Sequence, residues 1–457
     1  AAAHVRTVAA APGSARRSVL MTTDRATPDA AKDPLQTTWF GHPPGLTILF
    51  LTEMWEKFSY FGMRALLVYY MTKALAMSQE DASWVYGGYT AFAYFTPILG
   101  GLIADRYLGR RRAVILGGSI MAAGHFMMAF PGMFYPALAT IAIGNGFFLP
   151  SLPSQVRYLY APGDPRGDSA FSVYYVGINL GAVLAPLICG TLGELYGWHY
   201  GFAAAGVGMC IGLLIYIWGG RYLPRAAGAV QAWEPATHDK ERSFARRFGL
   251  LIGVIAIIVV FRGAYEQIGN TVALWADSGV DRSAGLGWTI PSTWFQALNP
   301  LLVFTITPLL LLLWARRGRT AHTATPLRRM ALGAIIVAMS YGLLALASAQ
   351  SAASGTQAHW LWLFAFFLVF TTGELFILPT GLALFGRLAP GALAATTMAL
   401  WFSASFAGNL LAGALGSFWT RLGATDFFMM TAAVAALAAL LLRVVDGPAR
   451  RTLDARN

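Results

Sequence analysis

Residues 45–73 read GLTILFLTEMWEKFSYFGMRALLVYYMTK, an apolar stretch interrupted by a few charges. A membrane-spanning helix needs about 20 predominantly apolar residues, so this stretch is long enough to cross a bilayer. At about 100° per residue, its polar side chains form one stripe of that helix. They are Glu53, Glu56, Lys57, Tyr60 and Arg64. A charge at a helix centre costs about 2.5 to 3.5 kcal/mol on insertion scales, so the stripe faces a wet cavity or pairs internally. A functional site is the favoured interpretation, and a structural ion-pair cluster is the alternative.

The rest of the chain repeats this apolar pattern. Of 457 residues, 56% are hydrophobic and only 12% are charged, which is more apolar side chain than one soluble core can bury. We expect an all-α integral membrane protein with twelve transmembrane helices. Their predicted ranges are 45–73, 82–105, 112–130, 134–158, 170–193, 200–222, 248–276, 290–315, 330–349, 358–388, 394–419 and 425–443.

The positions of the basic residues predict the orientation. Of the 33 Lys and Arg, three fall in predicted outer loops (Lys73, Arg282, Arg421), three inside predicted helices (Lys57, Arg64, Arg262), and the others on one common side. Cytoplasmic loops of membrane proteins carry this excess of positive charge. Both termini are therefore predicted to be cytoplasmic. The net charge of +12 then reflects topology and contact with anionic membrane lipid rather than a nucleic-acid partner.

The longest internal polar stretch divides the predicted helices into two sets of six. The predicted order is a cytoplasmic tail at 1–42, an N-terminal bundle at 43–223, a cytoplasmic linker at 224–247, a C-terminal bundle at 248–443 and a second tail at 444–457. Met21 is an alternative start within the first tail.

Buried charges are also predicted in the second half. Arg262 and Glu266 stand four residues apart in one helix, and Glu374 precedes Pro379 in another. A proline interrupts the helix hydrogen-bond ladder, which predicts a flexible half-helix there. Ion pairs between two bundles can latch one side of a cavity and open when one partner is protonated. A carboxyl group in a low dielectric takes up a proton more readily than in water, so this arrangement provides a mechanism for proton drive.

A basic loop follows the second predicted helix and reads GLIADRYLGRR from Gly101 to Arg111. Asp105 stands beside several arginines, where it can accept charge-assisted hydrogen bonds and hold two helices together. We predict a conformational role for Asp105, Arg106 and Gly109. The pattern resembles the signature between helices 2 and 3 of the major facilitator superfamily, which fits two bundles of six helices.

The string EMWEKFSYFG from Glu53 to Gly62 resembles the ExxERFxYYG motif of the proton-dependent oligopeptide transporters. Other stretches resemble that family in the family's own order. They are FSVYYVGINLGAVLAPLICGTLG (171–193), YEQ (265–267), QALNP (296–300) and GEL (373–375). The resemblance covers nearly the whole chain from the first to the last predicted helix. As a set these motifs are highly specific.

The resemblance implies a symporter that imports di- and tripeptides with protons by alternating access. Glu53, Glu56 and Lys57 match the coupling motif, in which Lys57 replaces an arginine that also helps to bind the peptide carboxylate. Arg64 and Glu266 match the pair that forms an outer gate, and Glu266 also belongs to the predicted coupling set. Glu374 matches the acid that meets the peptide amino terminus. The other matched pocket positions are Tyr60, Phe61, Tyr94, Asn179, Asn299, Trp401 and Phe402.

Besides Lys57, three positions depart from the family pattern. Leu149 stands where a GNGxxKP string has a lysine, so the usual partner of Glu56 and Glu374 is absent. Lys57 is the candidate replacement for either acid. Arg262 stands where an aromatic residue can occur, and it either tunes or neutralises Glu266 or helps to hold a carboxylate, so we place it with Lys57 and Arg64 in the predicted substrate-binding set. Phe61 replaces a tyrosine and removes a hydroxyl group.

Two other functions are alternatives. One is a proton-coupled carrier of another small solute on the same fold, such as a peptide-like drug, an amino acid or an anion. The other is a membrane enzyme or sensor, against which the sequence has no GxSxG motif, phosphate-binding loop or metal-ligand cluster. Cys189, Cys210 and the buried His125 are expected to be packing residues. We predict no cofactor other than protons, no metal, a monomer, and a location in the cell inner membrane.

Overall fold

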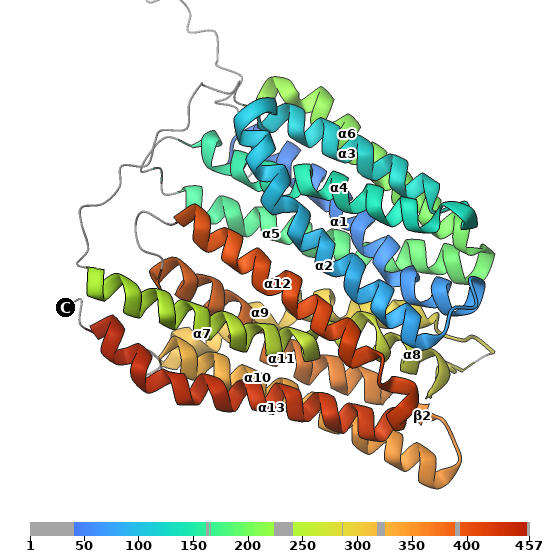
Figure 1. Ribbon diagram of the computed structural model, residues 1–457. Helices are drawn as coiled ribbons and strands as arrows, with labels where there is room; N and C mark the ends of the chain where they lie inside the picture. Colours follow the sequence, from blue (N-terminus) through green and yellow to red (C-terminus); the bar gives the residue numbers. More distant parts are fainter. Residues whose placement is uncertain are drawn as a thin grey trace, which may run out of the picture.

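The computed structural model describes residues 41–160, 164, 166–223, 241–285, 287–317, 325–388 and 394–454. Nearly all of the predicted tail at 1–42 and most of the predicted linker at 224–247 lie outside these residues. The two predicted halves appear as separate groups of helices, drawn in blue to green and in yellow-green to red (Figure 1).

Each group is a bundle of long helices. The N-terminal bundle contains α1 (Pro44–Tyr69), α2 (Gln79–Ile103), α3 (Arg110–Met127), α4 (Phe134–Ser151), α5 (Arg166–Ala185) and α6 (Trp198–Trp218). The C-terminal bundle contains α7 (Glu241–Tyr265), α8 (Thr271–Ser278), α9 (Leu298–Arg317), α10 (Pro326–Ser354), α11 (Leu361–Leu388), α12 (Ala394–Gly416) and α13 (Trp419–Asp454). Two short parallel strands, β1 (Val280–Asp281) and β2 (Ala358–His359), join loops of the second bundle.

The helices confirm a multi-spanning all-α membrane fold. Within the described residues, nine helical stretches are long and apolar enough to cross a membrane. The charged residues of α1 interrupt its apolar run, so α1 is not among those nine although it lies at the first predicted span. The total of twelve spans stays a prediction.

Some helix ends differ from the predicted ranges. α7 begins at Glu241, inside the range predicted as linker, and α13 continues to Asp454, inside the range predicted as tail. The structure gives no break at Pro379, because α11 runs through it as one helix. α13 does bend at Gly423, where φ is +75°, a conformation that glycine adopts without a Cβ penalty.

Local sequence explains several of the helix starts. Ser78 caps α2 by accepting a 3.0 Å hydrogen bond from the Asp81 amide, and Glu80 and Asp81 lie in the first turn, where negative charge is favourable. Thr325 caps α10 in the same way, and proline occupies its first position. These signals place α2 and α10 where their apolar faces can enter the two bundles.

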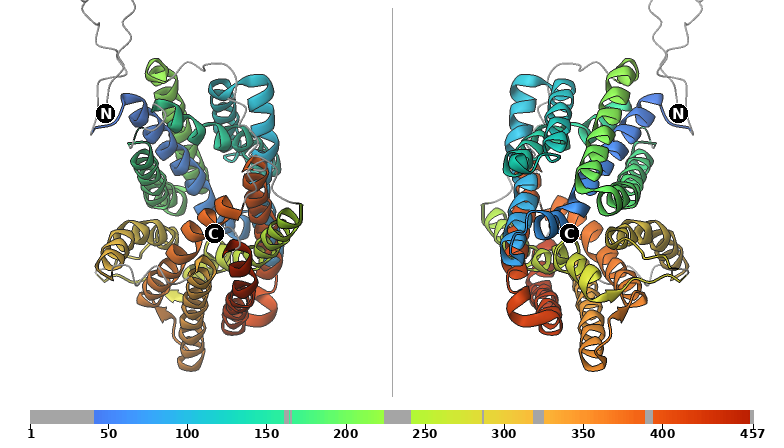
Figure 2. Two further views of the ribbon diagram at one scale, coloured as in Figure 1. Left: turned by 90° about the vertical axis from the view of Figure 1, so that its left-hand side faces the viewer. Right: turned by 90° about the vertical axis from the view of Figure 1, so that its right-hand side faces the viewer.

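The two bundles meet along α2 and α12 (Figure 2). A Cβ atom on Gly87 of α2 would lie 2.5 Å from the Gly413 Cα of α12, so only glycine permits this approach. α1 begins and α13 ends at the same end of the molecule, on the left of Figure 1. We call this end the terminal side and the other end the far side.

Candidate functional site

Glu266 holds two arginines. It follows α7, at the start of a 3₁₀ turn, where its Oε1 lies 2.6 Å from Arg262 Nη1 and its Oε2 lies 2.5 Å from Arg64 Nη2. All three side chains are buried, with at most 11% of each exposed. We call Arg64, Arg262 and Glu266 the arginine cluster. Because arginine stays protonated, the cluster has one net positive charge.

The arginine cluster joins the two bundles. Arg64 belongs to α1, whereas Arg262 and Glu266 belong to the C-terminal bundle. Arg64 Nε also donates a 2.7 Å hydrogen bond to the Tyr86 hydroxyl on α2. The pairing predicted between Arg64 and Glu266 is therefore present, and Arg262 adds a second cation to the same carboxylate.

Arg262 also contacts two aromatic rings. Its guanidinium carbon lies 5.2 Å from the centre of the Tyr94 ring and 5.9 Å from that of Tyr265, within the range of cation–π attraction. Its Nε is buried without a hydrogen-bond partner among the described residues. The Arg262 guanidinium is therefore held in position while part of its donor capacity is unused.

Glu374 forms a second charged centre, with a different kind of partner. Its Oε1 accepts a 2.8 Å hydrogen bond from the Tyr265 hydroxyl, and its Oε2 accepts one of 2.6 Å from Asn299 Nδ2. Asn299 Nδ2 also donates to Thr371 Oγ1 at 3.0 Å. Glu374 is 7% exposed and makes no ion pair within the described ranges. This carboxyl group is thus oriented by neutral donors.

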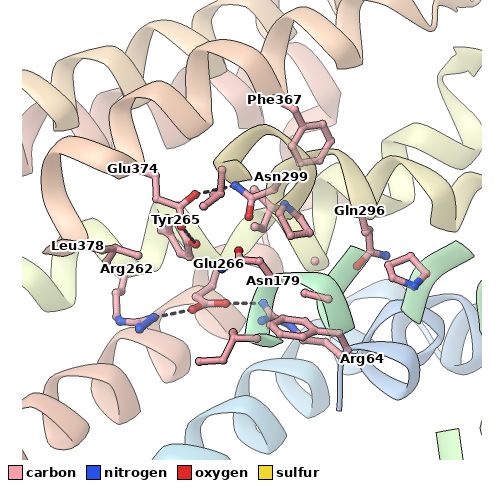
Figure 3. Close-up of a pocket in the computed structure, with 18 of the residues that line it drawn as sticks. Arg64, Asn179, Arg262, Tyr265, Glu266, Gln296, Asn299, Phe367, Glu374 and Leu378 are labelled. Atoms are coloured by element: carbon pink, nitrogen blue, oxygen red, sulfur yellow. Dashed lines mark hydrogen bonds and ion pairs between the residues drawn. The ribbon is translucent and has the colours of Figure 1, made fainter. Parts of the chain in front are cut away.

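Both centres line one cavity (Figure 3), whose walls come from both bundles. Seven of the predicted substrate-binding residues line it: Phe61, Arg64, Tyr94, Asn179, Arg262, Asn299 and Glu374. Other lining residues that can bind a ligand were not in the predicted substrate-binding set. They include Tyr175, Tyr265, Gln296 and Phe367. Three of these four, Tyr175, Tyr265 and Gln296, lie inside the motifs that carry the family resemblance, so the motifs contained the signal.

Four predicted substrate-binding residues lie outside the wall of this cavity. Tyr60 is buried against Phe61, with ring centres 5.3 Å apart, and Phe402 lies 6.5 Å from the ring of Tyr94. Trp401 packs against the core of the C-terminal bundle. The fourth is Lys57.

Lys57 is paired within its own helix. Its Nζ lies 3.3 Å from Glu53 Oε1 and 2.6 Å from Glu56 Oε2, and the two carboxyl side chains are 2% and 1% exposed. We call these three residues the lysine cluster. With both acids ionised it has one net negative charge, and Glu56 Oε1 has no hydrogen-bond partner among the described residues. Of the two roles weighed for Lys57, the structure shows pairing with Glu56 and not with Glu374.

The lysine cluster lies where α5 packs closely on α1. A Cβ atom on Gly181 would lie 2.1 Å from the Met54 carbonyl oxygen and 3.1 Å from Lys57 Cβ. This glycine belongs to the resembling stretch at 171–193 and lets α5 approach the helix that bears the charges. Leu149, at the position of the absent lysine, is partly buried in α4.

The far side of the molecule is closed by polar contacts between the bundles. Glu194, after α5, accepts hydrogen bonds from the backbone amides of Ser292 at 3.0 Å and Thr293 at 2.7 Å. The Tyr69 hydroxyl donates to the Ala273 carbonyl at 2.8 Å. Gln296 Nε2 donates to the Ala65 carbonyl at 3.1 Å.

The hydrogen bonds and ion pairs that join the two bundles, among described residues, lie in the half of the molecule nearer the far side. Glu194 was not predicted from the sequence, since only the fold brings the amides of Ser292 and Thr293 to it.

The predicted conformational loop is largely exposed. Asp105 lies in a π-helical turn (Ala104–Leu108), 59% exposed, and its Oδ1 is 3.7 Å from Arg110 Nε. Arg106 is exposed, and Gly109 has a φ of +74° at the sharp turn into α3. An exposed pair at this distance contributes at most about 1 kcal/mol. The conformational role of this loop stays a prediction.

The remaining candidates are buried away from this chemistry. His125 is fully buried in α3, and neither ring nitrogen has a partner among described residues. Cys189 and Cys210 are free thiols. In the part of the chain that the structure describes, no group of three or more His, Cys, Asp or Glu could hold a metal ion.

Comparisons with known proteins agree with this geometry. The family model described as "POT family" matches residues 111–227 and 226–431. An uncharacterized transporter, YclF of Bacillus subtilis, is 32% identical over 86% of this chain and 91% of its own length. The peptide transporter YePEPT of Yersinia enterocolitica is 30% identical over 83% and 88%. The crystal structure of a mutant of peptide transporter POT in complex with alafosfalin superposes with a TM-score of 0.82 at 30% identity, covering 92% of this chain and 97% of that one.

Proposed function

Because the chain belongs to the POT family of transporters, we propose that it is a proton-coupled symporter that imports di- and tripeptides by alternating access. It is a multi-pass membrane protein. We place it in the cell inner membrane with its terminal side in the cytoplasm, in keeping with its bacterial relatives and the distribution of its basic residues.

One observation carries the proposal: the cavity has two oppositely charged ends. The arginine cluster supplies one net positive charge, and Glu374 supplies a negative charge whose hydrogen-bond partners among the described residues, Tyr265 and Asn299, are neutral. A peptide is a zwitterion with an ammonium group at one end and a carboxylate at the other. The ammonium group fits Glu374 and the carboxylate fits the arginine cluster.

The wall between the two ends suits a peptide of variable sequence. Asn179, Gln296 and Asn299 provide amide groups that can bond the peptide backbone. Phe61, Tyr175 and Phe367 provide apolar surface that accepts side chains without strict shape requirements. This combination fixes the orientation of the peptide while allowing several side chains. It also favours a zwitterion over a simple anion, which is one of the alternative solutes.

Proton coupling fits the lysine cluster. One cation between two buried carboxylates leaves one negative charge, which a single proton neutralises. Glu53 and Glu56 share that proton as a pair, so we assign it to the cluster rather than to one acid. In this structure the contacts of the far side are closed, which corresponds to the state that faces the cytoplasm.

We also propose that the protein uses protons as its coupling ion, with no metal or other cofactor, and that it performs transport rather than catalysis. It works as a monomer in contact with membrane lipid. These statements rest on the family and on the sequence pattern.

Uptake of labelled dialanine into proteoliposomes tests the proposal. We expect an inward proton gradient to stimulate uptake and unlabelled dipeptides to compete with it. Uptake that the proton gradient does not stimulate would contradict proton coupling. Uptake that dipeptides do not inhibit would favour a different small solute.

A further inference from the structure

We propose that Arg262 anchors the carboxylate of the substrate, so that the C-terminal bundle holds both charged ends of the peptide. This inference rests on the proposed function and assigns one subsite within it. Three buried cations are candidates for the role: Lys57, Arg64 and Arg262. Their contacts distinguish them.

Lys57 lies outside the cavity wall. Its Nζ is held between two carboxylates of its own helix, at 3.3 Å from Glu53 and 2.6 Å from Glu56. To reach a substrate it would have to leave two buried ion pairs, and each acid would then be buried without its partner. Removing one partner of a buried ion pair is strongly unfavourable. Leu149 supplies no cation in its place.

Arg64 lines the cavity, but two of its nitrogens are already bonded. Its Nη2 binds Glu266 of the other bundle at 2.5 Å, and its Nε donates to the Tyr86 hydroxyl of its own bundle at 2.7 Å. The bond to Glu266 belongs to the closed far side. A carboxylate that drew Arg64 away would open that contact instead of filling an available site.

Arg262 lines the cavity and has unused capacity. Only its Nη1 is bonded to Glu266, and its Nε is a buried donor without a partner among described residues. A guanidinium has five N–H donors, so it can keep Glu266 and bind a second carboxylate. The rings of Tyr94 and Tyr265, which also line the cavity, hold it in place.

Tyr265 contacts both charged ends of the cavity. Its ring lies 5.9 Å from the Arg262 guanidinium, and its hydroxyl donates to Glu374 at 2.8 Å. A dipeptide, whose two extended residues span about 7 Å, is expected to bridge Glu374 on α11 and Arg262 on α7.

This placement has a mechanistic consequence. Apart from Arg64, the N-terminal bundle contributes uncharged groups to the cavity, including Phe61, Tyr94 and Asn179. The peptide therefore remains with the C-terminal bundle when the bundles rock. A carboxylate bound to Arg262 also places a second negative charge beside Glu266, which links occupancy to the contact between Glu266 and Arg64.

The test compares dialanine with dialanine amide, which lacks the carboxylate. Affinities are measured by calorimetry on purified protein without a proton gradient, so that coupling does not enter. One charged hydrogen-bonded contact corresponds to about a 10- to 100-fold difference in Kd, and we expect the wild type to prefer dialanine by that factor. Arg262→Gln should bring the preference below about threefold, mainly by weakening dialanine. Arg262→Lys should keep part of it, because lysine keeps the charge but not the forked geometry.

Arg328→Gln is the matched control, since it also removes an arginine that pairs with a carboxylate, at 2.8 Å from Asp446, but lies outside the cavity wall. It should keep the wild-type preference. The proposal is overturned if Arg262→Gln keeps the preference or if Arg328→Gln loses it. Should Arg262→Gln not yield folded protein, an undiminished preference in Arg262→Lys overturns the proposal and a reduced one supports it. A wild type that binds dialanine and its amide equally contradicts the Arg262 assignment alone. A wild type that binds no dialanine contradicts the proposed function as well.

Discussion

The arginine cluster and the lysine cluster are two buried groups of three charged residues with net charges of opposite sign. The first has two cations around one carboxylate and lines the cavity, whereas the second has two carboxylates around one cation and does not. An excess of cation attracts an anionic group of a substrate, and an excess of carboxylate accepts a proton. On this difference rests our proposal that the substrate and the proton bind at separate places.

The two clusters also differ in what they connect. The lysine cluster lies within α1, while the arginine cluster spans both bundles beside the closed contacts of the far side. Arg64 follows Glu56 by eight residues, which is about 12 Å along a helix. α1 therefore carries both sites as one rigid element, and a change of charge at one can bias the position of the other.

Glu266→Ala should produce the largest effect on stability. It leaves Arg64 and Arg262 buried side by side without their carboxylate, and loss of one member of a buried pair costs about 3 to 5 kcal/mol. We expect a clear drop in the Tm of the detergent-purified protein and loss of dialanine uptake. A variant with wild-type Tm would mean that the arginine cluster contributes little to the closed state.

Leu149→Lys tests the other cluster. In the family pattern a lysine at this position partners Glu56, so restoring it should neutralise the excess negative charge of the lysine cluster. A nearby cation favours the ionised carboxylate by about 1 to 3 pH units, and stronger acid is then needed to load the proton. The pH of half-maximal uptake should therefore fall by about one unit. An unchanged pH profile would show that the absent lysine does not affect the coupling site.

Glu80→Ala should have the smallest effect and is the matched control for Glu266→Ala. Glu80 Oε1 also pairs with an arginine of the other bundle, Arg421, at 3.0 Å, but the two side chains are 41% and 61% exposed. An exposed pair contributes about 0 to 1 kcal/mol. Uptake and Tm should stay close to wild type. A loss as large as that of Glu266→Ala would mean that burial does not distinguish the two cross-bundle pairs.

The sequence predicted much of the site because its chemistry is concentrated in motifs. Charges inside an apolar helix are costly, so Arg64, Glu266 and Glu374 were predicted as candidate site residues from the sequence, and all three line the cavity. The membrane fold followed from the same apolar periodicity. The start of α7 at Glu241 was not predicted, because polar residues before a span can continue its helix.

What the sequence left open depended on contacts between elements. A stripe on α1 identifies Lys57 as buried but does not say whether it faces the cavity or its own acids, and the second arrangement is the observed one. The sequence does not distinguish the three roles predicted for Arg262, because these roles depend on its contacts with Tyr94 and Glu266. Glu194 drew no attention because its partners are backbone amides about 100 residues away, as expected for groups that only the fold brings together.

The central claim is that the lysine cluster carries the coupling proton and the cavity carries the peptide. Glu56→Gln tests it most directly, with two assays on the same proteoliposomes. Accumulation of labelled dialanine driven by an inward proton gradient should be abolished, while counterflow exchange of labelled for unlabelled dialanine should continue. Wild-type rates in both assays would contradict the claim and remove Glu56 from the coupling mechanism.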